Sequence, residues 1–401
     1  MKPIEGGVTA PEGFVASGVY AGLKRNPEKL DCALVMSECE CVVAGTFTKN
    51  VMKAPPILWT MEVCQRGKAW GVFINSGNAN AATGKQGIAN VKEMAAFVAS
   101  CGPFLPSDVC ICSTGVIGVL LPMDKIENGI DDCIDTLSKT GGTQAARAIM
   151  TTDTVVKERA LELELGGKPV KLGAMAKGSG MISPNMATMI CVVTTDATIE
   201  HDLLTTLLQS AVNQSFNQIG IDNDMSTSDV VLVFANGESG AAEIQAGSPE
   251  YAQFAEALMA LCQDMAKDLV KDGEGATKFV EISITGTQND EDAKTIARAI
   301  GNSMLCKTAF FGQDPNWGRF ACAAGYSGVI FSPEDLTVAL EDIVLCRNGQ
   351  VAQYREEDAA AIMKRPEFTI HVSVGAGAGR GIFWTSDLSH DYVSINADYR
   401  S

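Results

Sequence analysis

A single hydroxyl, that of Thr188, stands where glycine-rich chain meets a short run of β-forming residues. The segment reads Lys177-Gly-Ser-Gly-Met-Ile-Ser-Pro-Asn-Met-Ala-Thr-Met189. A threonine hydroxyl is a weak nucleophile at neutral pH, but the α-amino group of the same residue can act as its base once Thr188 begins a chain. Such an amine has a pKa of about 7.7 to 8, which suits proton transfer near neutral pH. We therefore predict that Thr188 is both a self-cleavage site and a catalytic nucleophile.

The bond that would break joins Ala187 to Thr188. The hydroxyl would attack the Ala187 carbonyl, where the small side chain gives little obstruction, and hydrolysis of the ester would leave residues 1–187 and 188–401. Threonine is stiff at χ1, which holds its oxygen in one direction. Taken alone, the same residues also fit a plainer interpretation, in which Ala-Thr only begins a buried strand. Other parts of the chain must decide between the two.

Further blocks accompany this segment and run in order from one end of the chain to the other. They are Phe73-Ile-Asn-Ser-Gly-Asn-Ala-Asn80, Cys112-Ser-Thr-Gly-Val-Ile-Gly118, Thr151-Thr-Asp-Thr154, Asp272-Gly-Glu-Gly-Ala-Thr-Lys278, Gly312-Gln-Asp-Pro-Asn-Trp-Gly-Arg319 and Asn396-Ala-Asp-Tyr-Arg-Ser401. Together they resemble the ornithine acetyltransferase family, whose members are also called glutamate N-acetyltransferases and are bifunctional enzymes of arginine biosynthesis.

The resemblance implies a complete reaction. Thr188, freed by cleavage after Ala187, would take acetyl from N2-acetylornithine, release ornithine and pass the acetyl group to glutamate, with ping-pong kinetics. No cofactor is implied, and acetyl-CoA stays open as a co-substrate. The family also implies a heterotetramer that holds two copies of each cleaved fragment.

The family's site residues carry over onto matching positions. Thr114 and Gly115 correspond to the oxyanion hole, and the substrate-binding residues are Thr154, Lys177, Thr188, Glu274, Asn396 and Ser401. Lys177 could receive a carboxylate and Glu274 an ammonium group. Read without the family, Thr114-Gly115 suits a turn that needs glycine, and a lone Lys or Glu is normally solvated. Met225 and Ser228 depart from the family pattern beside the nucleophile.

The family also predicts an unusual carboxyl terminus. Chain ends are usually frayed, but Ser401 is expected to dock and complete the substrate pocket. For Asp314-Pro-Asn-Trp317 we expect only a turn, with Trp317 anchoring the second domain.

Composition excludes several classes. The chain has 401 residues, is 46% hydrophobic and carries a net charge of −17, which opposes binding to nucleic acid. The longest apolar stretch, 116–123, is too short to span a membrane, and the amino terminus lacks a secretory apolar run, so we expect a cytoplasmic protein without a membrane partner. Thirteen scattered cysteines favour reduced core thiols, and three histidines outside any ligand pattern argue against a metal site.

Hydrophobic periodicity supplies the elements that must position these residues. Helical spacing is seen at 88–98, 202–219, 293–305 and in a long helix from Pro249 to near Gly273, while strand patterns occupy 70–75, 109–114, 189–194, 230–234, 279–285 and 368–374. We expect an α/β (α+β) protein. The resemblance implies a self-cleaving, DmpA-like layered sandwich with a smaller C-terminal α+β domain. Its parts would be an α chain, 1–187, residues 188–280 that complete the catalytic domain, and the C-terminal domain, 281–401.

Three alternatives stay open. The nearest is an amidase or aminopeptidase of the same fold, in which water replaces glutamate as acceptor, although relatives of that kind usually carry Ser as the nucleophile. A nucleotide-binding module is suggested by Gly375-Ala-Gly-Ala-Gly-Arg-Gly381, which lacks the third glycine of Gly-x-Gly-x-x-Gly and has no βαβ unit after it. The third is a non-catalytic assembly protein.

Overall fold

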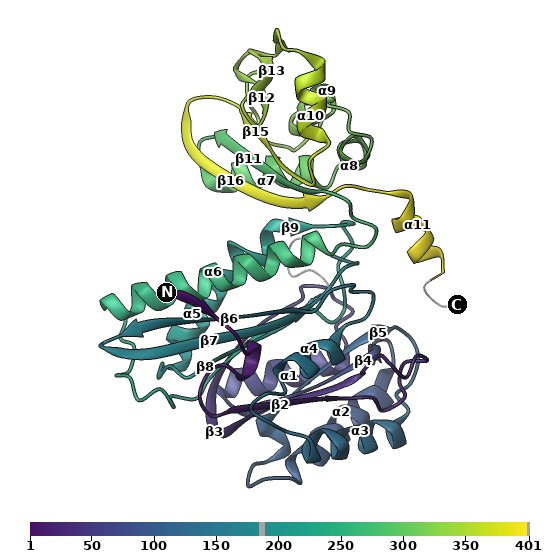
Figure 1. Ribbon diagram of the computed structural model, residues 1–401, viewed down its shortest axis with the longest axis vertical. Coiled ribbons are helices and arrows are strands. Elements are labelled where there is room, and N and C mark those ends of the chain that lie inside the picture. The colour runs from purple at the N-terminus through teal and green to yellow at the C-terminus, as the bar shows by residue number, and fades with distance from the viewer. Residues whose placement is uncertain (184–188, 399–401) are drawn as a thin grey trace. The chain divides into compact units, whose positions relative to one another are not determined.

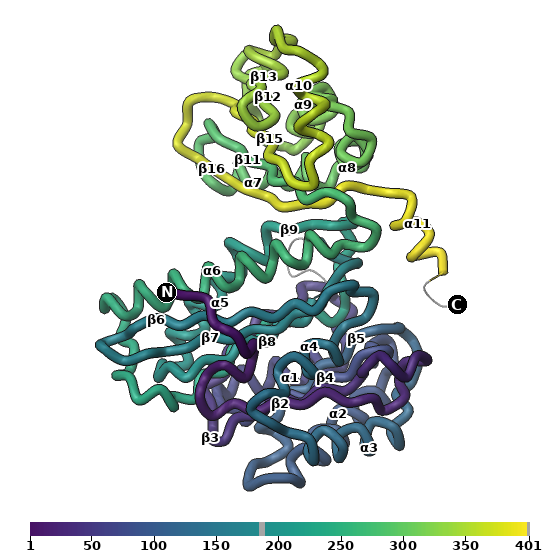
Figure 2. Tube along the Cα trace, in the orientation of Figure 1, coloured from purple at the N-terminus to yellow at the C-terminus, as the bar shows by residue number. Residues whose placement is uncertain are grey.

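The computed structural model describes residues 1–183 and 189–398, and the chain forms two compact units. The first unit comprises residues 1–178, 185–217 and 225–269. The second comprises residues 179–184, 218–224 and 270–401. Figures 1 and 2 trace the chain by colour from its purple amino-terminal part to its yellow carboxyl-terminal part.

A nine-stranded sheet forms the centre of the first unit. In spatial order its strands are β1 (Lys2–Ile4), β6 (Lys157–Leu165), β7 (Lys168–Lys177), β8 (Ile190–Thr195), β10 (Val230–Ala235), β3 (Cys32–Phe47), β4 (Lys68–Asn78) and β5 (Val109–Val116), with β2 (Phe14–Val19) also paired to β3. The register of β3 against β4 shifts between Met36 and Cys41. The early part of β3 pairs with β2, whereas its last six residues pair with β10.

The two parts of this sheet form layers. Ile190 and Val192 of β8 share a buried core with Val72 and Ile74 of β4, and this core also contains the alanines of α4 (Gly142–Ile149). The other face of β3 and β4 forms a second core with α2 (Gly84–Ala99) and α3 (Met123–Asp135). Helix α1 (Pro55–Arg66) contributes to the first core. The expected layered α/β arrangement is therefore present.

The long helix predicted from Pro249 is α6 (Pro249–Lys271), and its apolar stripe is buried as expected. Figure 1 draws it with α5 (His201–Asn213) along the β6–β8 part of the sheet. The helix predicted over 202–219 is too long, because α5 ends at Asn213. Ile219 and Gly220 instead form β9, which pairs with Trp384 and Thr385.

The second unit is built on a seven-stranded sheet. Its strands, in spatial order, are β14 (Gln350–Val351), β13 (Ile343–Arg347), β12 (Thr337–Leu340), β15 (Glu367–Ser373), β11 (Phe279–Gly286), β16 (Gly377–Ser386) and β9 (Ile219–Gly220). The alternating runs predicted around 279–285 and 368–374 are β11 and β15, which pair in parallel. Trp317, which begins α9 (Trp317–Gly325), packs against the core of this unit as expected, and α10 (Glu356–Met363) contributes to that core.

The single helix predicted over 293–305 is wrong. The structure has α7 (Asp290–Gly301) and a separate helix, α8 (Met304–Phe311). Ser303 caps the start of α8, where its side chain accepts a hydrogen bond from the backbone N–H of Cys306. An apolar spacing that continues through a cap is read from sequence as one helix, which explains the error.

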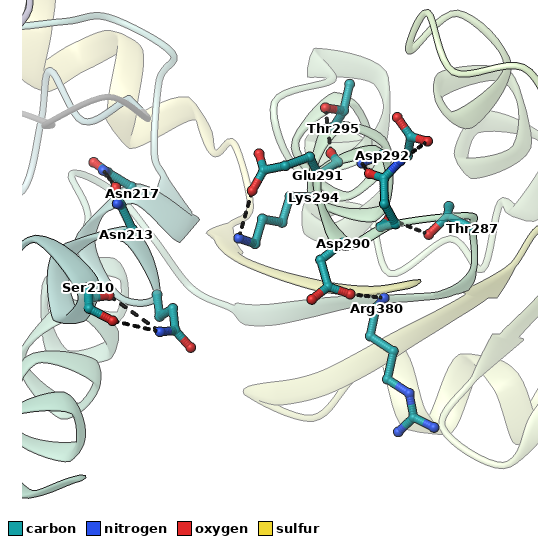
Figure 3. A network of polar contacts seen from close by, with 12 residues as sticks. Ser210, Asn213, Asn217, Thr287, Asp290, Glu291, Asp292, Lys294, Thr295 and Arg380 are labelled. Atoms are coloured by element: carbon teal, nitrogen blue, oxygen red, sulfur yellow. Dashed lines mark hydrogen bonds and ion pairs between the residues drawn. The ribbon is translucent and has the colours of Figure 1, made fainter. Parts of the chain in front are cut away.

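The glycine run 375–381 has a structural role in the second unit. A Cβ at Gly377 would lie 2.0 Å from the Thr287 carbonyl oxygen, and one at Gly381 would lie 2.5 Å from Lys294 N. These glycines therefore let β16 approach the start of α7 closely. Figure 3 shows the contacts there: the backbone N–H of Arg380 donates to the carboxylate of Asp290 at 2.8 Å. Because the run begins a strand antiparallel to β11, it is no phosphate-binding turn before a helix, which removes the nucleotide-binding alternative.

All thirteen cysteines are free thiols, and ten of them are buried. Cys39 is half-buried, whereas Cys101 and Cys322 are exposed. Burial raises the pKa of Cys112, Cys191 and most other core thiols. In the described part of the chain, no helix is long and apolar enough to cross a membrane.

One buried lysine should make the second unit's stability depend on pH. Lys307 of α8 donates hydrogen bonds to Thr385 Oγ1 at 3.0 Å and to Ser386 Oγ at 3.3 Å, and burial lowers the pKa of its ammonium group from 10.5 to about 7. Between these values the unfolded chain holds a proton that the folded chain lacks. The contribution of Lys307 to the free energy of unfolding should therefore increase from pH 7 to about 10 and decrease again when the pH is lowered through this range.

Urea unfolding of the wild type and of Lys307→Met at several pH values measures this effect. All other titratable groups are common to the two proteins, so their contributions cancel in the difference between the two free energies of unfolding. The difference between the two should grow in favour of the wild type by up to about 1.4 kcal/mol per pH unit within that window. A difference that does not change with pH would contradict the prediction.

Candidate active site

The predicted oxyanion-hole pair lies at the end of β5, next to β4. Thr114 is buried, and Gly115 has a φ of +130°. A Cβ at Gly115 would lie only 2.3 Å from the carbonyl carbon of Gly77, so glycine is required where the two backbones meet. Glycine adopts a positive φ without strain, whereas a residue with a side chain would not fit here. Both readings made from the sequence, a required glycine and an oxyanion hole, fit this geometry, and the second stays a prediction.

A buried cluster of charges lies in the same unit. The carboxylate of Asp153 accepts hydrogen bonds from Lys157 Nζ at 2.7 Å, from the backbone N–H of Gly178 at 2.7 Å and from that of Thr151 at 2.9 Å. The side chains of both members of the Asp153–Lys157 ion pair are almost completely buried. Charged groups without water need such close partners, because burying an ion alone is very unfavourable.

Lys177 belongs to this cluster and ends β7. Its residue is only 3% exposed, unlike the solvated lysine that its type alone would suggest. Burial alone would raise the pKa of Asp153, but the charges of Lys177 and Lys157 and the Gly178 N–H hold it well below its ordinary value. The charges of Lys177 and Lys157 thus both act on the Asp153 carboxylate, and the charge of Lys177 also acts on the buried Asp229, where it opposes the rise in pKa that burial causes.

Thr154, a further predicted substrate-binding residue, lies beside this cluster. It is exposed and directly follows the buried Asp153. Sequence reasoning singled out Thr154 and Lys177 but missed the ion pair that supports them. The available signal was the acid inside Thr151-Thr-Asp-Thr154 with a lysine four residues after it.

The chain just after the predicted nucleophile is held by a buried acid. Met189, the residue that follows Thr188 in sequence, donates its backbone N–H to Asp229 Oδ1 at 3.1 Å. Val230 donates its own N–H to the Met189 carbonyl at 3.0 Å. Asp229 is fully buried, and burial raises the pKa of its carboxyl group well above the ordinary value. Asp229 was not predicted as a site residue.

Glu274, another predicted substrate-binding residue, belongs to the second unit. It lies in the loop after α6, is 9% exposed, and donates its backbone N–H to the Ser179 carbonyl at 2.7 Å. A Cβ at Gly180 would lie 2.5 Å from the Glu274 carboxylate, so the glycine makes room for this side chain. The carboxylate also accepts a hydrogen bond of 2.8 Å from Asn396 Nδ2. Two predicted substrate-binding residues, Glu274 and Asn396, are therefore in contact.

Three predicted site residues lie outside the described residues: Ala187, Thr188 and Ser401. Among the residues that are described, no group of His, Cys, Asp and Glu has the arrangement of a metal site.

A solved structure of similar sequence supports the fold class. The structure of the arginine biosynthesis bifunctional protein argJ from Bacillus halodurans is 41% identical, with a TM-score of 0.51, and the match covers 52% of this chain and 98% of that chain. The predicted fold class, a mixed α/β fold with a smaller C-terminal α+β unit, is confirmed.

Relatives of full length identify the family. Two proteins named arginine biosynthesis bifunctional protein ArgJ match all of this chain over all of their own length: one from Symbiobacterium thermophilum at 46% identity and one from Caldanaerobacter subterraneus subsp. tengcongensis at 44%. The chain belongs to the ArgJ family, which matches residues 15–401. This confirms the predicted resemblance and the prediction of an acetyltransferase enzyme of arginine biosynthesis.

Removing the buried carboxylate should destabilise the first unit. Asp153→Asn would leave Lys157 and Lys177 buried beside a neutral amide, and breaking a buried ion pair in this way typically lowers the free energy of unfolding by about 3 to 5 kcal/mol. Urea unfolding measures the loss.

Asp268→Asn is the matched control, because it breaks the more exposed Asp268–Arg159 pair of the same unit and should cost about 0 to 1 kcal/mol. The double variant Asp153→Asn, Lys157→Met should regain part of the loss. If the two single variants lost equal free energies of unfolding, the buried pair would contribute no more to stability than the exposed pair.

Proposed function

We propose that this protein transfers acetyl from N2-acetylornithine to glutamate through an acetyl group held on Thr188, giving ornithine and N-acetylglutamate. The full-length match to the ArgJ family carries this proposal. The sequence blocks that resemble the family, among them the one that holds Ala187 and Thr188, support the choice of residues.

Maturation would come first. The Thr188 hydroxyl attacks the carbonyl carbon of Ala187, the C–N bond between them breaks, and the Thr188 amine takes up the hydroxyl proton. Water then hydrolyses the ester, which leaves a carboxylate on Ala187 and a free α-amine on Thr188. The hold of Asp229 on Met189 supports this step, because it fixes the peptide that follows the proposed nucleophile.

Acetyl transfer would follow on the matured chain. The Thr188 amine accepts the hydroxyl proton while the oxygen attacks the acetyl carbonyl of N2-acetylornithine. Backbone N–H groups at Thr114 and Gly115 would stabilise the negative oxygen of the tetrahedral intermediate. Its collapse breaks the C–N bond, and ornithine leaves with the proton. The amine of glutamate then attacks the acetyl ester and regenerates the hydroxyl.

Charge complementarity assigns the substrate's ends. Lys177, a buried lysine whose charge acts on Asp153, would receive the α-carboxylate that both amino-acid substrates carry. Glu274, steadied by Asn396, would receive an ammonium group such as the one at the end of the ornithine side chain. Thr154 and Ser401 would complete the binding set.

Two finer features belong to the same proposal. The fragments 1–187 and 188–401 would stay together as a heterotetramer with two copies of each. The word bifunctional in the names of the relatives supports a second reaction, in which acetyl-CoA supplies the acetyl group for glutamate. The proposed site needs no other cofactor.

The first test is of self-cleavage. Denaturing gels with mass spectrometry of the purified protein should give two fragments that meet at Ala187/Thr188. Thr188→Ala should stay intact at 42.3 kDa and lose all transferase activity, since it lacks the attacking oxygen. Thr188→Ser, which keeps a hydroxyl, is the matched control and should still be cleaved. An intact wild-type chain would instead favour a non-catalytic assembly protein.

Acceptor dependence completes this test. Ornithine release from N2-acetylornithine should be fast only when glutamate is present, and acetyl-CoA with glutamate tests the second reaction. Equally fast release without glutamate would favour the amidase or aminopeptidase alternative, in which water is the acceptor.

The carboxyl terminus should matter for turnover. Deleting residues 399–401 removes Ser401, which the proposal places in the substrate pocket, and kcat/KM for N2-acetylornithine should fall by at least about tenfold, the value of one hydrogen bond to a charged group. Self-cleavage, measured on the same sample, should be unaffected. Unchanged kinetics in the truncated protein would rule out a docked terminus.

A further inference from the structure

Asp222 holds the chain that leads toward the proposed scissile bond. It lies just after β9, in the second unit. Its Oδ2 accepts the backbone N–H of Met181 at 2.6 Å, and its Oδ1 accepts that of Ile182 at 2.8 Å. The main chain adds a third bond, because the Ile221 N–H donates to the Ile182 carbonyl at 2.9 Å. The loop 181–182 is thus fixed by two consecutive N–H groups on one carboxylate.

This loop is strained where Asp222 holds it. Met181 has a φ of +55°, in the left-handed region that residues other than glycine seldom adopt, and its side chain is 42% exposed. The short bond from the Met181 N–H to Asp222 is an observed restraint on this unfavourable backbone conformation. Ala187 follows only six residues after Met181 in the sequence.

The same carboxylate also binds the last helix of the chain. Tyr392, in α11 (His390–Ala397), donates its hydroxyl to Asp222 Oδ2 at 3.2 Å. Asn396 follows four residues later, on the same face of the helix, and is the residue that donates to Glu274. Burial, and next the negative charge of Asp222, raise the pKa of the Tyr392 hydroxyl, so it stays a donor at neutral pH.

Helix α11 has no fully buried residue, and only Tyr392 and Ile395 are half-buried, so its polar bonds contribute much of what holds it. Its other described contacts are few: at its N-cap, Ser389 donates to the Gly275 carbonyl at 2.6 Å, and the His390 ring meets Phe311 edge to face. Losing the Tyr392 bond should therefore loosen the helix that carries Asn396.

We propose that Asp222 is a positioning residue for both stages of the proposed function. Through Met181 and Ile182 it sets the path of the chain into the segment that is cleaved. Through Tyr392 it holds α11, so that Asn396 stays against Glu274 for substrate binding. The inference rests on the proposed function, and it adds a physical link between maturation and substrate binding.

Two variants separate the two roles. In Asp222→Asn the amide NH2 would face a backbone N–H in place of an acceptor, so both roles suffer. Tyr392→Phe removes only the hydroxyl and leaves the bonds to Met181 and Ile182 intact. Asp224→Asn is the matched control, because it makes the same charge change two residues away at an exposed side chain.

Each variant has its own expected pattern. Asp222→Asn should slow self-cleavage at least about tenfold, since it loses a charged acceptor, and its matured fraction should have a raised KM for N2-acetylornithine. Tyr392→Phe should be cleaved at the wild-type rate but show the raised KM, with kcat changed less. Asp224→Asn should match the wild type in both assays. If Asp222 only stabilised the fold, its variant would give less folded protein, and the folded fraction would have the wild-type cleavage rate and KM.

Hydrogen exchange gives a readout that does not need activity. The amides of residues 393–397 should exchange at least about tenfold faster in Asp222→Asn and in Tyr392→Phe than in the wild type or Asp224→Asn. If the wild-type protein is neither cleaved nor active but the two variants still exchange faster than it does, the contact of Asp222 with Tyr392 is supported and the proposed function is rejected. Wild-type cleavage, KM and exchange in Asp222→Asn, or wild-type KM and exchange in Tyr392→Phe, would overturn the inference itself.

Discussion

Burying a positive charge is very unfavourable unless a strong acceptor lies beside it, and Asp153 is such an acceptor for the buried Lys157 of the first unit. Its two oxygens bind the loop after α4, the first residue of β6 and the backbone just beyond β7. One carboxylate thus joins three segments that meet where Lys177 ends its strand. The charge of Lys177, the candidate carboxylate-binding lysine, in turn helps to hold the pKa of Asp153 well below its ordinary value.

Much of the fold was predictable because it follows from local patterns. Strands β8, β10, β11 and β15 and helices α2 and α6 lie close to where apolar periodicity placed them. The errors come from effects that periodicity does not record. A serine cap divides α7 from α8, and the residues after Asn213 that were expected to be helical include β9, which pairs with β16. Both depend on hydrogen bonds whose partners are not set by the apolar pattern.

The candidate site was predictable only where the family supplied it. Residue types alone would have placed Lys177 and Glu274 in solvent, whereas both are buried and have partners in their own units. Asp222 and Asp229 were not singled out because their importance comes from backbone N–H groups about forty residues away in the chain, such as the contact of Asp222 with Met181. Nothing in an isolated aspartate signals that its acceptor oxygens will be used in this way. The roles of Ala187, Thr188 and Ser401 remain predictions.

The distribution of the thiols offers a practical handle on this molecule. Most cysteines are buried with raised pKa values, so they present little thiolate to a labelling reagent. The two exposed ones are divided between the units, Cys101 in the first and Cys322 in the second. The natural chain therefore already carries one accessible attachment point on each unit. A donor and acceptor dye placed there would report by energy transfer whether substrate changes the separation of the two units, without any engineered residue.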